Sequence, residues 1–152
     1  MAIVGMLHVA LGVSDIGRSL AFYRDILGFS VVGEMALASA AAARTLRVDA
    51  QVRGALLERD GFRLELLQRA DAADVVDEQG GARSALSHLA LAVDDLASTL
   101  HSLRDRGVAV LEETLVQHAP GVASCLVRDP DGLPIALYQA PAGVTSPWEL
   151  RG

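Results

Sequence analysis

Two histidines stand at matching places in the chain and carry the first recognisable chemistry. His8 opens the segment HVALGVSD and His88 opens HLALAVDD, and an aspartate follows each histidine seven positions later. Glu65 lies in a further segment, FRLELLQ. Imidazole and carboxylate groups can bind a divalent metal ion, and both can move protons. Two matching histidines are also what a duplicated ancestor would leave behind without any function, so both interpretations stay open.

A second pair of segments extends this internal repeat. RDGFRLELLQ at 59–68 aligns with PDGLPIALYQ at 130–139, and the Asp-Gly pairs and the final glutamines coincide. In this alignment Glu65 falls on Ala136, so a carboxylate in the first half is a methyl in the second. Ala136 is therefore either the place of a lost functional group or ordinary filler in a strand.

The surrounding pattern predicts the elements that position these residues. Each histidine segment is typical of a strand that leads into a helix, with Asp15 and Asp95 as N-caps. Apolar stripes at helical spacing follow, and Gly28 and Gly107 stand where a left-handed residue ends a helix. Strand-like sequence then occupies 29–35, 51–58 and 62–68 in the first half, and 108–113, 115–118, 123–129 and 133–139 in the second. Each half is therefore predicted to be β-α-β-β-β.

Alternation along the strands predicts two different faces. In FRLELLQ, Leu64 and Leu66 share one face and Glu65 points to the other, so we expect a helix-covered side and a wet side. Ala10 and Gly12 share a face with His8, and Ala90 and Ala92 share one with His88, so these small side chains leave room for a guest molecule.

The composition bounds the class of protein. The chain has 152 residues, 51% of them hydrophobic, which is enough for one domain or two small modules with a shared core and favours a homodimer. The net charge of −6 argues against nucleic acid and anionic membranes as partners. All 13 basic residues are arginines, which excludes Schiff-base and P-loop chemistry because both need a lysine.

We predict a single domain made of two modules, in the cytoplasm. The first module spans 1–70, the connector 71–87, the second module 88–140 and a C-terminal tail 141–152. Cys125 is the only cysteine, so no internal disulfide can form. The apolar start of the chain has no basic region and no cleavage site, so we do not expect a signal peptide, and no apolar run is long enough to span a bilayer.

The motifs HVALGVSD, FYRDILGF, LELL, SHLALAVDD, LRDRGV and DPDG together resemble the vicinal-oxygen-chelate superfamily, which includes glyoxalase I, epimerases, extradiol dioxygenases and bleomycin-resistance proteins. The resemblance covers roughly residues 5–140. It implies an α+β fold in which paired βαβββ modules form an open, cup-shaped mixed sheet.

The same resemblance implies a metal site. In metal-dependent members the ligands come from the first and last strands of each module, which carries over to His8, Glu65 and His88, while Ala136 departs from the pattern. This set suits a divalent Fe, Mn, Co, Ni or Zn ion and leaves positions open for water or substrate. The resemblance further implies a lyase or isomerase acting on a small oxygen-rich metabolite, with Glu65 as base. Tyr138 shares a face with Ala136, and its phenol either hydrogen-bonds the substrate or packs as an apolar ring.

Two other functions stay open. One is Fe(II)-dependent ring cleavage by an extradiol-type dioxygenase, and the other is a non-catalytic small-molecule binder such as an antibiotic-resistance protein. The alanine at 136 favours the binder, whereas the paired histidines favour a metal enzyme. Among the remaining polar residues, we expect His101 on the surface and Cys125 as a buried, inert thiol. His118 lies near a strand end and could approach the cup, but we expect it in a loop.

Overall fold

The computed structural model describes residues 4–37, 52–69 and 86–141. The chain divides into two compact units, Met1–Ala82 and Arg83–Gly152, and each is described here by itself. Nearly all of the predicted connector, 71–87, and of the predicted tail, 141–152, lies outside the described residues. In the described ranges no helix is long and apolar enough to cross a membrane.

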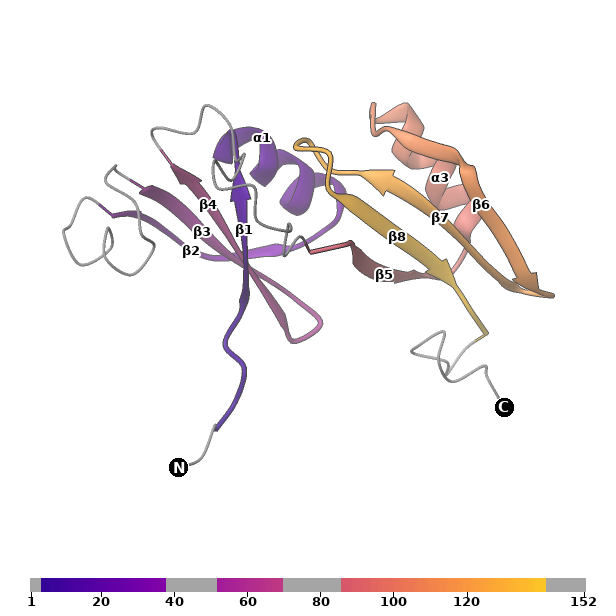
Figure 1. Ribbon diagram of the computed structural model, residues 1–152, viewed down its shortest axis with the longest axis horizontal. Helices are drawn as coiled ribbons and strands as arrows, with labels where there is room; N and C mark the ends of the chain where they lie inside the picture. Colours follow the sequence, from indigo (N-terminus) through magenta and orange to yellow (C-terminus); the bar gives the residue numbers. More distant parts are fainter. Residues whose placement is uncertain (1–3, 38–51, 70–85, 142–152) are drawn as a thin grey trace, which may run out of the picture. The chain divides into compact units, whose positions relative to one another are not determined.

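The first unit is a four-stranded sheet with one helical segment (Figure 1). Its elements are β1 (Val9–Val13), α1 (Ile16–Leu20), η1 (Ala21–Ile26), β2 (Ser30–Leu37), β3 (Val52–Arg59) and β4 (Phe62–Arg69). The strand order is β1-β4-β3-β2, with β1 parallel to β4 and the other pairs antiparallel. The first strand therefore pairs with the last strand of its unit.

The second unit repeats this topology. Its elements are β5 (Leu89–Val93), α3 (Leu96–Asp105), β6 (Val110–Ala119), β7 (Val122–Arg128) and β8 (Pro134–Gln139). The order β5-β8-β7-β6 matches that of the first sheet, and β5 is again parallel to β8. The predicted β-α-β-β-β repeat and the α+β class are confirmed.

One strand boundary was predicted wrongly. The segments 108–113 and 115–118 form the single strand β6 rather than two strands. The pairing of β6 with β7 is irregular between Leu111 and Val116, so β6 does not follow one alternating pattern along its length. A register shift of this kind interrupts the period of two from which strands are predicted.

Both helices begin at the aspartates that the sequence predicts as N-caps. The side chain of Asp15 accepts a hydrogen bond from the backbone N–H of Arg18 at 2.8 Å, and Asp95 does the same for Ser98 at 2.8 Å. These bonds satisfy N–H groups that the first turn of a helix leaves without a partner.

A glutamine from the last strand of each unit completes the helix start. The backbone N–H of Ile16 donates to Gln68 Oε1 at 2.7 Å, and that of Leu96 donates to Gln139 Oε1 at 2.7 Å. These are the two glutamines that coincide in the sequence repeat. They join the helix to the strand beside it, which explains why the repeat includes them.

The helices also end at the glycines that the sequence predicts. In the first unit α1 continues into the π-helical segment η1, where the N–H of Leu27 bonds to the carbonyl of Phe22. Gly28 and Gly107 then adopt φ values of +74° and +78°, the left-handed region that only glycine enters without strain. The predicted helix ends are confirmed.

The apolar core of each unit lies between the helix and one face of the sheet. α1 packs on β3 and β4, and α3 packs on β6, β7 and β8. The predicted helical stripes are buried, as are the alternating leucines of the strands below them. The main core residues are Ile16, Leu20, Tyr23, Leu27, Leu57, Leu64 and Leu66 in the first unit, and Leu96, Leu100, Leu103, Cys125, Val127, Ile135 and Leu137 in the second. The opposite face of each sheet is the one available for a site.

Candidate functional site

The uncovered face of the first sheet holds the predicted acid. Along β4, Leu64 is 4% exposed and Leu66 is fully buried, whereas Glu65 between them is half-buried. On β1 the exposed positions are Ala10 and Gly12. Small side chains on the strand beside Glu65 leave its carboxylate accessible, so the predicted wet face is confirmed.

His8 and Glu65 lie together on this face. His8 Nε2 is 3.1 Å from Glu65 Oε2, and the two side chains are 37% and 17% exposed. The parallel pairing of β1 with β4 brings them together, because Glu65 is in register with Ala10, two residues after His8. Residues far apart in sequence are thereby held at hydrogen-bonding distance.

The spacing of this pair fits a metal ion as well as a hydrogen bond. Ligand atoms about 2.1 Å from an ion and at right angles to each other lie about 3.0 Å apart. The separation of 3.1 Å between the imidazole nitrogen and the carboxylate oxygen is close to that value. A neutral imidazole and a carboxylate are also ligands that Fe, Mn, Co, Ni and Zn accept. In donor type and in spacing, therefore, these two residues fit the metal that the sequence resemblance implies.

The basic side chain nearest to Glu65 along β4 forms an ion pair with another residue. Arg63, two residues before Glu65, donates from Nε to Glu58 Oε2 at 3.0 Å. Glu58 is in register with Arg63 on the neighbouring strand β3. The Glu58 carboxylate thus neutralises the guanidinium, and the carboxylate of Glu65 pairs with His8.

The second unit presents the corresponding positions without a carboxylate. Ala136 is in register with Ala90, and Tyr138 with Ala92, so these four side chains share the uncovered face of the sheet. Ala136 and Tyr138 are half-buried. His88 is exposed just before β5, and its Nδ1 lies 2.7 Å from the hydroxyl of Ser87. Ala136, which departs from the ligand pattern of the family, therefore places its methyl group on the uncovered face and not in the core.

His118 is not in a loop, contrary to the sequence prediction. It lies in β6, with Nε2 2.8 Å from Ser124 Oγ and its ring centroid 6.0 Å from that of Tyr138. The turn that the sequence HAPG indicates begins only after Ala119, at Pro120 and Gly121. The alternation of apolar and polar residues in LVQH indicates a strand. The neighbouring Pro-Gly pair indicates a turn, and the loop prediction for His118 followed the Pro-Gly pair.

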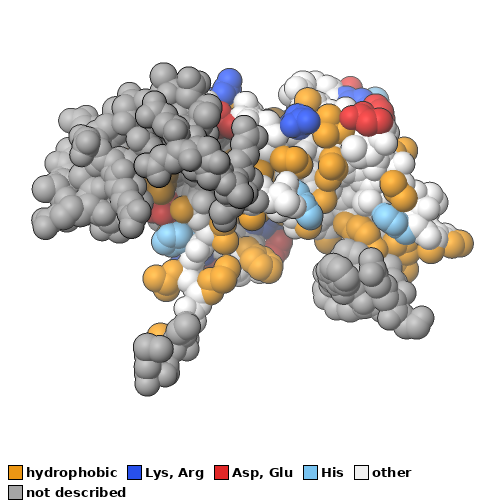
Figure 2. All heavy atoms as spheres, viewed as in Figure 1, with side chains coloured by type: hydrophobic (Ala, Val, Ile, Leu, Met, Phe, Trp, Pro, Cys, Tyr) orange, Lys and Arg blue, Asp and Glu red, His pale blue; other side chains and the backbone are white. Residues whose placement is uncertain are grey.

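Two other polar residues lie where the sequence predicts them. His101 is exposed on α3, 3.5 Å from Asp105, and Cys125 is 1% exposed in the core. No group of three or more His, Cys, Asp or Glu side chains forms a ready metal cage among the residues that the structure describes. Figure 2 shows histidine side chains at the surface among apolar ones. Of the predicted ligands, the first unit brings together His8 and Glu65.

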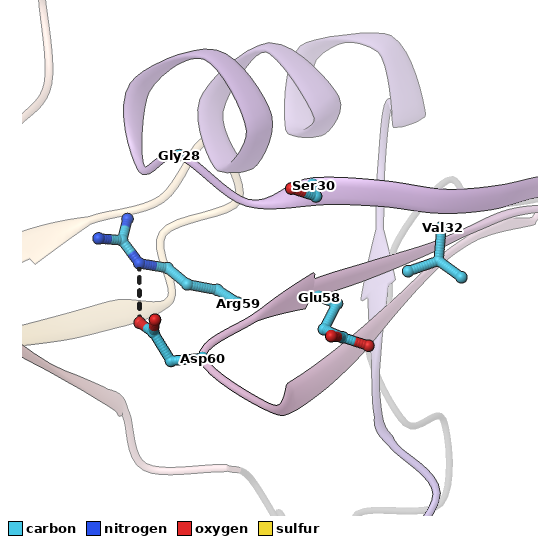
Figure 3. A pocket seen from close by; sticks show the side chains of 6 residues that line it. All are labelled: Gly28, Ser30, Val32, Glu58, Arg59 and Asp60. Carbon is cyan, nitrogen blue, oxygen red and sulfur yellow. Dashed lines mark hydrogen bonds and ion pairs between the residues drawn. The ribbon is translucent and has the colours of Figure 1, made fainter.

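A surface hollow of about 390 Å³ lies elsewhere in the first unit (Figure 3). It is lined by Gly28, Ser30, Val32, Glu58, Arg59 and Asp60. Arg59 donates to the carbonyl of Leu27 and from Nε to Asp60 Oδ2 at 3.3 Å. These bonds tie the β3–β4 turn to the end of η1, so the charged residues of the hollow have a structural role, and neither His8 nor Glu65 lines it.

Comparison with known proteins decides the family. The model of the glyoxalase/bleomycin resistance protein/dioxygenase superfamily matches residues 5–137. The chain belongs to this superfamily. Within it, a probable lactoylglutathione lyase of Synechocystis sp. is 30% identical over 141 residues, which cover 88% of this chain and 94% of that protein. A probable lactoylglutathione lyase of Vibrio cholerae is 28% identical over 138 residues, covering 88% and 89% of the two chains.

Solved structures agree on the glyoxalase-type fold. A glyoxalase family protein from Bacillus cereus superposes with a TM-score of 0.73 at 20% identity, covering 91% of this chain and 95% of that one. At this identity the likeness establishes the fold alone. Both the resemblance and the paired-module α+β architecture predicted from the sequence are confirmed.

Proposed function

We propose that this superfamily member is a divalent-metal-dependent lyase or isomerase that acts on a small oxygen-rich metabolite. His8 and Glu65 are the proposed ligands of the first unit, and His88, at the matching position of the second unit, is proposed as a metal ligand as well. The observation that carries the proposal is the pair of His8 Nε2 and Glu65 Oε2, 3.1 Å apart on an uncovered sheet face. Bound there, a divalent ion would supply Lewis acidity toward adjacent oxygens of the substrate.

Glu65 is the residue that we assign to proton transfer. Its carboxylate is half-buried and lies beside small residues, so a substrate can approach it. The interaction of Oε2 with His8 orients the carboxylate and leaves Oε1 as the oxygen that takes a proton. Ala136 provides no second carboxylate, so the role falls to Glu65 in this chain.

Tyr138 is the residue that we assign to substrate binding. It lies two positions after Ala136 on the same face, and its ring is half-buried. A phenol hydroxyl at the wet end of such a ring donates well to a substrate oxygen. The two relatives named above as probable lactoylglutathione lyases make S-lactoylglutathione chemistry the first reaction to test.

The decisive experiment is elemental analysis of untagged wild-type protein, His8→Ala and Glu65→Gln. We expect about one divalent ion per chain in the wild type and loss of most of it in both variants. His101→Ala is the matched control, because His101 is exposed on α3 and lies beside Asp105. Formation of S-lactoylglutathione from methylglyoxal and glutathione, with and without chelator, tests the reaction. An empty wild type whose melting temperature ignores added Mn, Fe, Co, Ni and Zn would overturn the proposal.

The methyl group at Ala136 favours a second candidate, a binder without catalysis. The side chain of Ala136 lies on the uncovered face, at the position that corresponds to Glu65 in the sequence repeat. Ligand affinity that survives removal of metal, together with no turnover, would identify a binder. Iron in the purified protein and oxygen consumption with catechols would instead identify a ring-cleaving dioxygenase.

A further inference from the structure

Three polar side chains meet on the uncovered face of the second sheet. They are His118, Ser124 and Tyr138, from the adjacent strands β6, β7 and β8. His118 Nε2 lies 2.8 Å from Ser124 Oγ, and the rings of His118 and Tyr138 are 6.0 Å apart and tilted by 39°. Ser124 is in register with Tyr138, so the two side chains are neighbours on this face of the sheet.

Within the described strands, the residues in register beside this cluster carry no charge. Ser124 is in register with Val116 on its other side, and Leu126 is in register with Ala136. Ser124 and Tyr138 are half-buried, whereas His118 is exposed and Val116 is 45% exposed. Hydrogen bonds to an anion from the half-buried members are stronger than those from fully solvated groups. A carboxylate at Ala136 would have repelled an anion from this place, and the alanine removes that repulsion.

Either tautomer of His118 leaves the cluster with hydrogen-bond donors to spare. If Nε2–H donates to Ser124, the serine hydroxyl hydrogen can turn to a ligand. If the serine donates to Nε2, the hydrogen on Nδ1 of the same ring is available instead. Tyr138 adds its phenol O–H in both cases. A hydroxyl or imidazole donor together with a phenol donor on one small surface can hydrogen-bond the oxygens of a carboxylate.

We propose that His118, Ser124 and Tyr138 form a binding site for the carboxylate of a small organic acid. The site uses residues of the second unit alone and needs no metal ion. It therefore extends the proposed function with a place for an acidic group of the ligand, and it stands or falls separately from the metal site.

The test is nuclear magnetic resonance of the imidazole groups in metal-stripped protein labelled with ¹⁵N-histidine, with pyruvate as the probe. We expect saturable shifts of the His118 signals, which His118→Gln identifies by their loss. His101, exposed beside Asp105, is the internal control and should not respond saturably. Ser124→Ala and Tyr138→Phe should each weaken pyruvate binding about fivefold, the effect of one lost hydrogen bond.

The two substitutions remove one hydroxyl each from half-buried positions, so the fold should persist, and a backbone amide spectrum verifies this for each variant. Absence of a saturable shift at His118 would overturn the site. Equal responses of His118 and His101, or binding unchanged in both hydroxyl variants, would overturn it as well. Because the protein is free of metal, none of these outcomes depends on whether His8 and Glu65 bind an ion.

Discussion

His8 Nε2 and Glu65 Oε2 lie 3.1 Å apart across two parallel strands, β1 and β4. Glu65 lies within β4, and His8 immediately precedes β1, so the sheet fixes the carboxylate and holds the imidazole next to it. Two of the three proposed ligands therefore already lie together within the first unit. Its counterpart in the second unit has the methyl of Ala136 in place of the acid.

Restoring the acid should strengthen metal binding. Ala136→Glu adds a carboxylate at the repeat position of Glu65, and we expect at least about tenfold tighter binding of Ni²⁺ or Zn²⁺, since even outer-shell partners of ligands contribute about 10–100-fold. A competition titration with a chromophoric chelator measures this. Ala97→Glu, exposed on α3, controls for the added charge. Equal affinities in the two variants would show that position 136 does not face the ion.

The glutamine at the end of β8 should stabilise α3. Gln139→Leu leaves the N–H of Leu96 without its acceptor, and we expect a loss of about 1–2 kcal/mol in the free energy of unfolding by urea. Gln139→Glu keeps an acceptor and adds negative charge at a helix N-terminus, so it should retain most of the stability. If the leucine and glutamate variants unfold at the same urea concentration, this hydrogen bond contributes nothing.

Ser19 offers a stabilising substitution. Its side chain is fully buried in α1, and its hydroxyl has no hydrogen-bond partner within the described part of the chain. Ser19→Ala removes the cost of burying an unpaired hydroxyl and favours the helix, so we expect a gain of about 1 kcal/mol in unfolding free energy. The control is Ser102→Ala, exposed on α3, which should be nearly neutral. A destabilised Ser19→Ala would mean that the hydroxyl has a partner after all.

Asp95 should make the folding stability of the second unit depend on pH. The hydrogen bond from the Ser98 backbone N–H lowers the pKa of this carboxyl below its usual value. Because the folded-state pKa is the lower one, the stabilisation is complete above the unfolded pKa of about 4 and disappears as pH falls through the folded pKa.

Asp95→Asn tests this dependence. Asparagine still accepts the capping bond but does not titrate, so the variant should lose less stability than the wild type as the pH falls below about 4. Thermal melts across this range, monitored by circular dichroism, provide the measurement. Parallel profiles for the two proteins would contradict the assignment.

Much of the fold could be predicted because it depends on local patterns. Asp15 and Asp95 cap helices through bonds that span only three residues, and Gly28 and Gly107 end helices through their own backbone freedom. The two faces of β4 follow from alternation alone. Errors arose where a neighbouring signal outweighed the local period, as at His118 beside Pro-Gly and at the register shift that made β6 look like two strands.

The repeat, the helix boundaries, the faces of the strands and the family could be predicted, because each depends on residue types at short or regular spacing. Which strands are neighbours became clear from the folded chain. The pairing of β1 with β4 brings His8 to Glu65, and the pairing of β7 with β8 brings Ser124 beside Tyr138. Such contacts depend on the register that buries the apolar face of every strand at once, and that register is a property of the whole sheet rather than of any one segment.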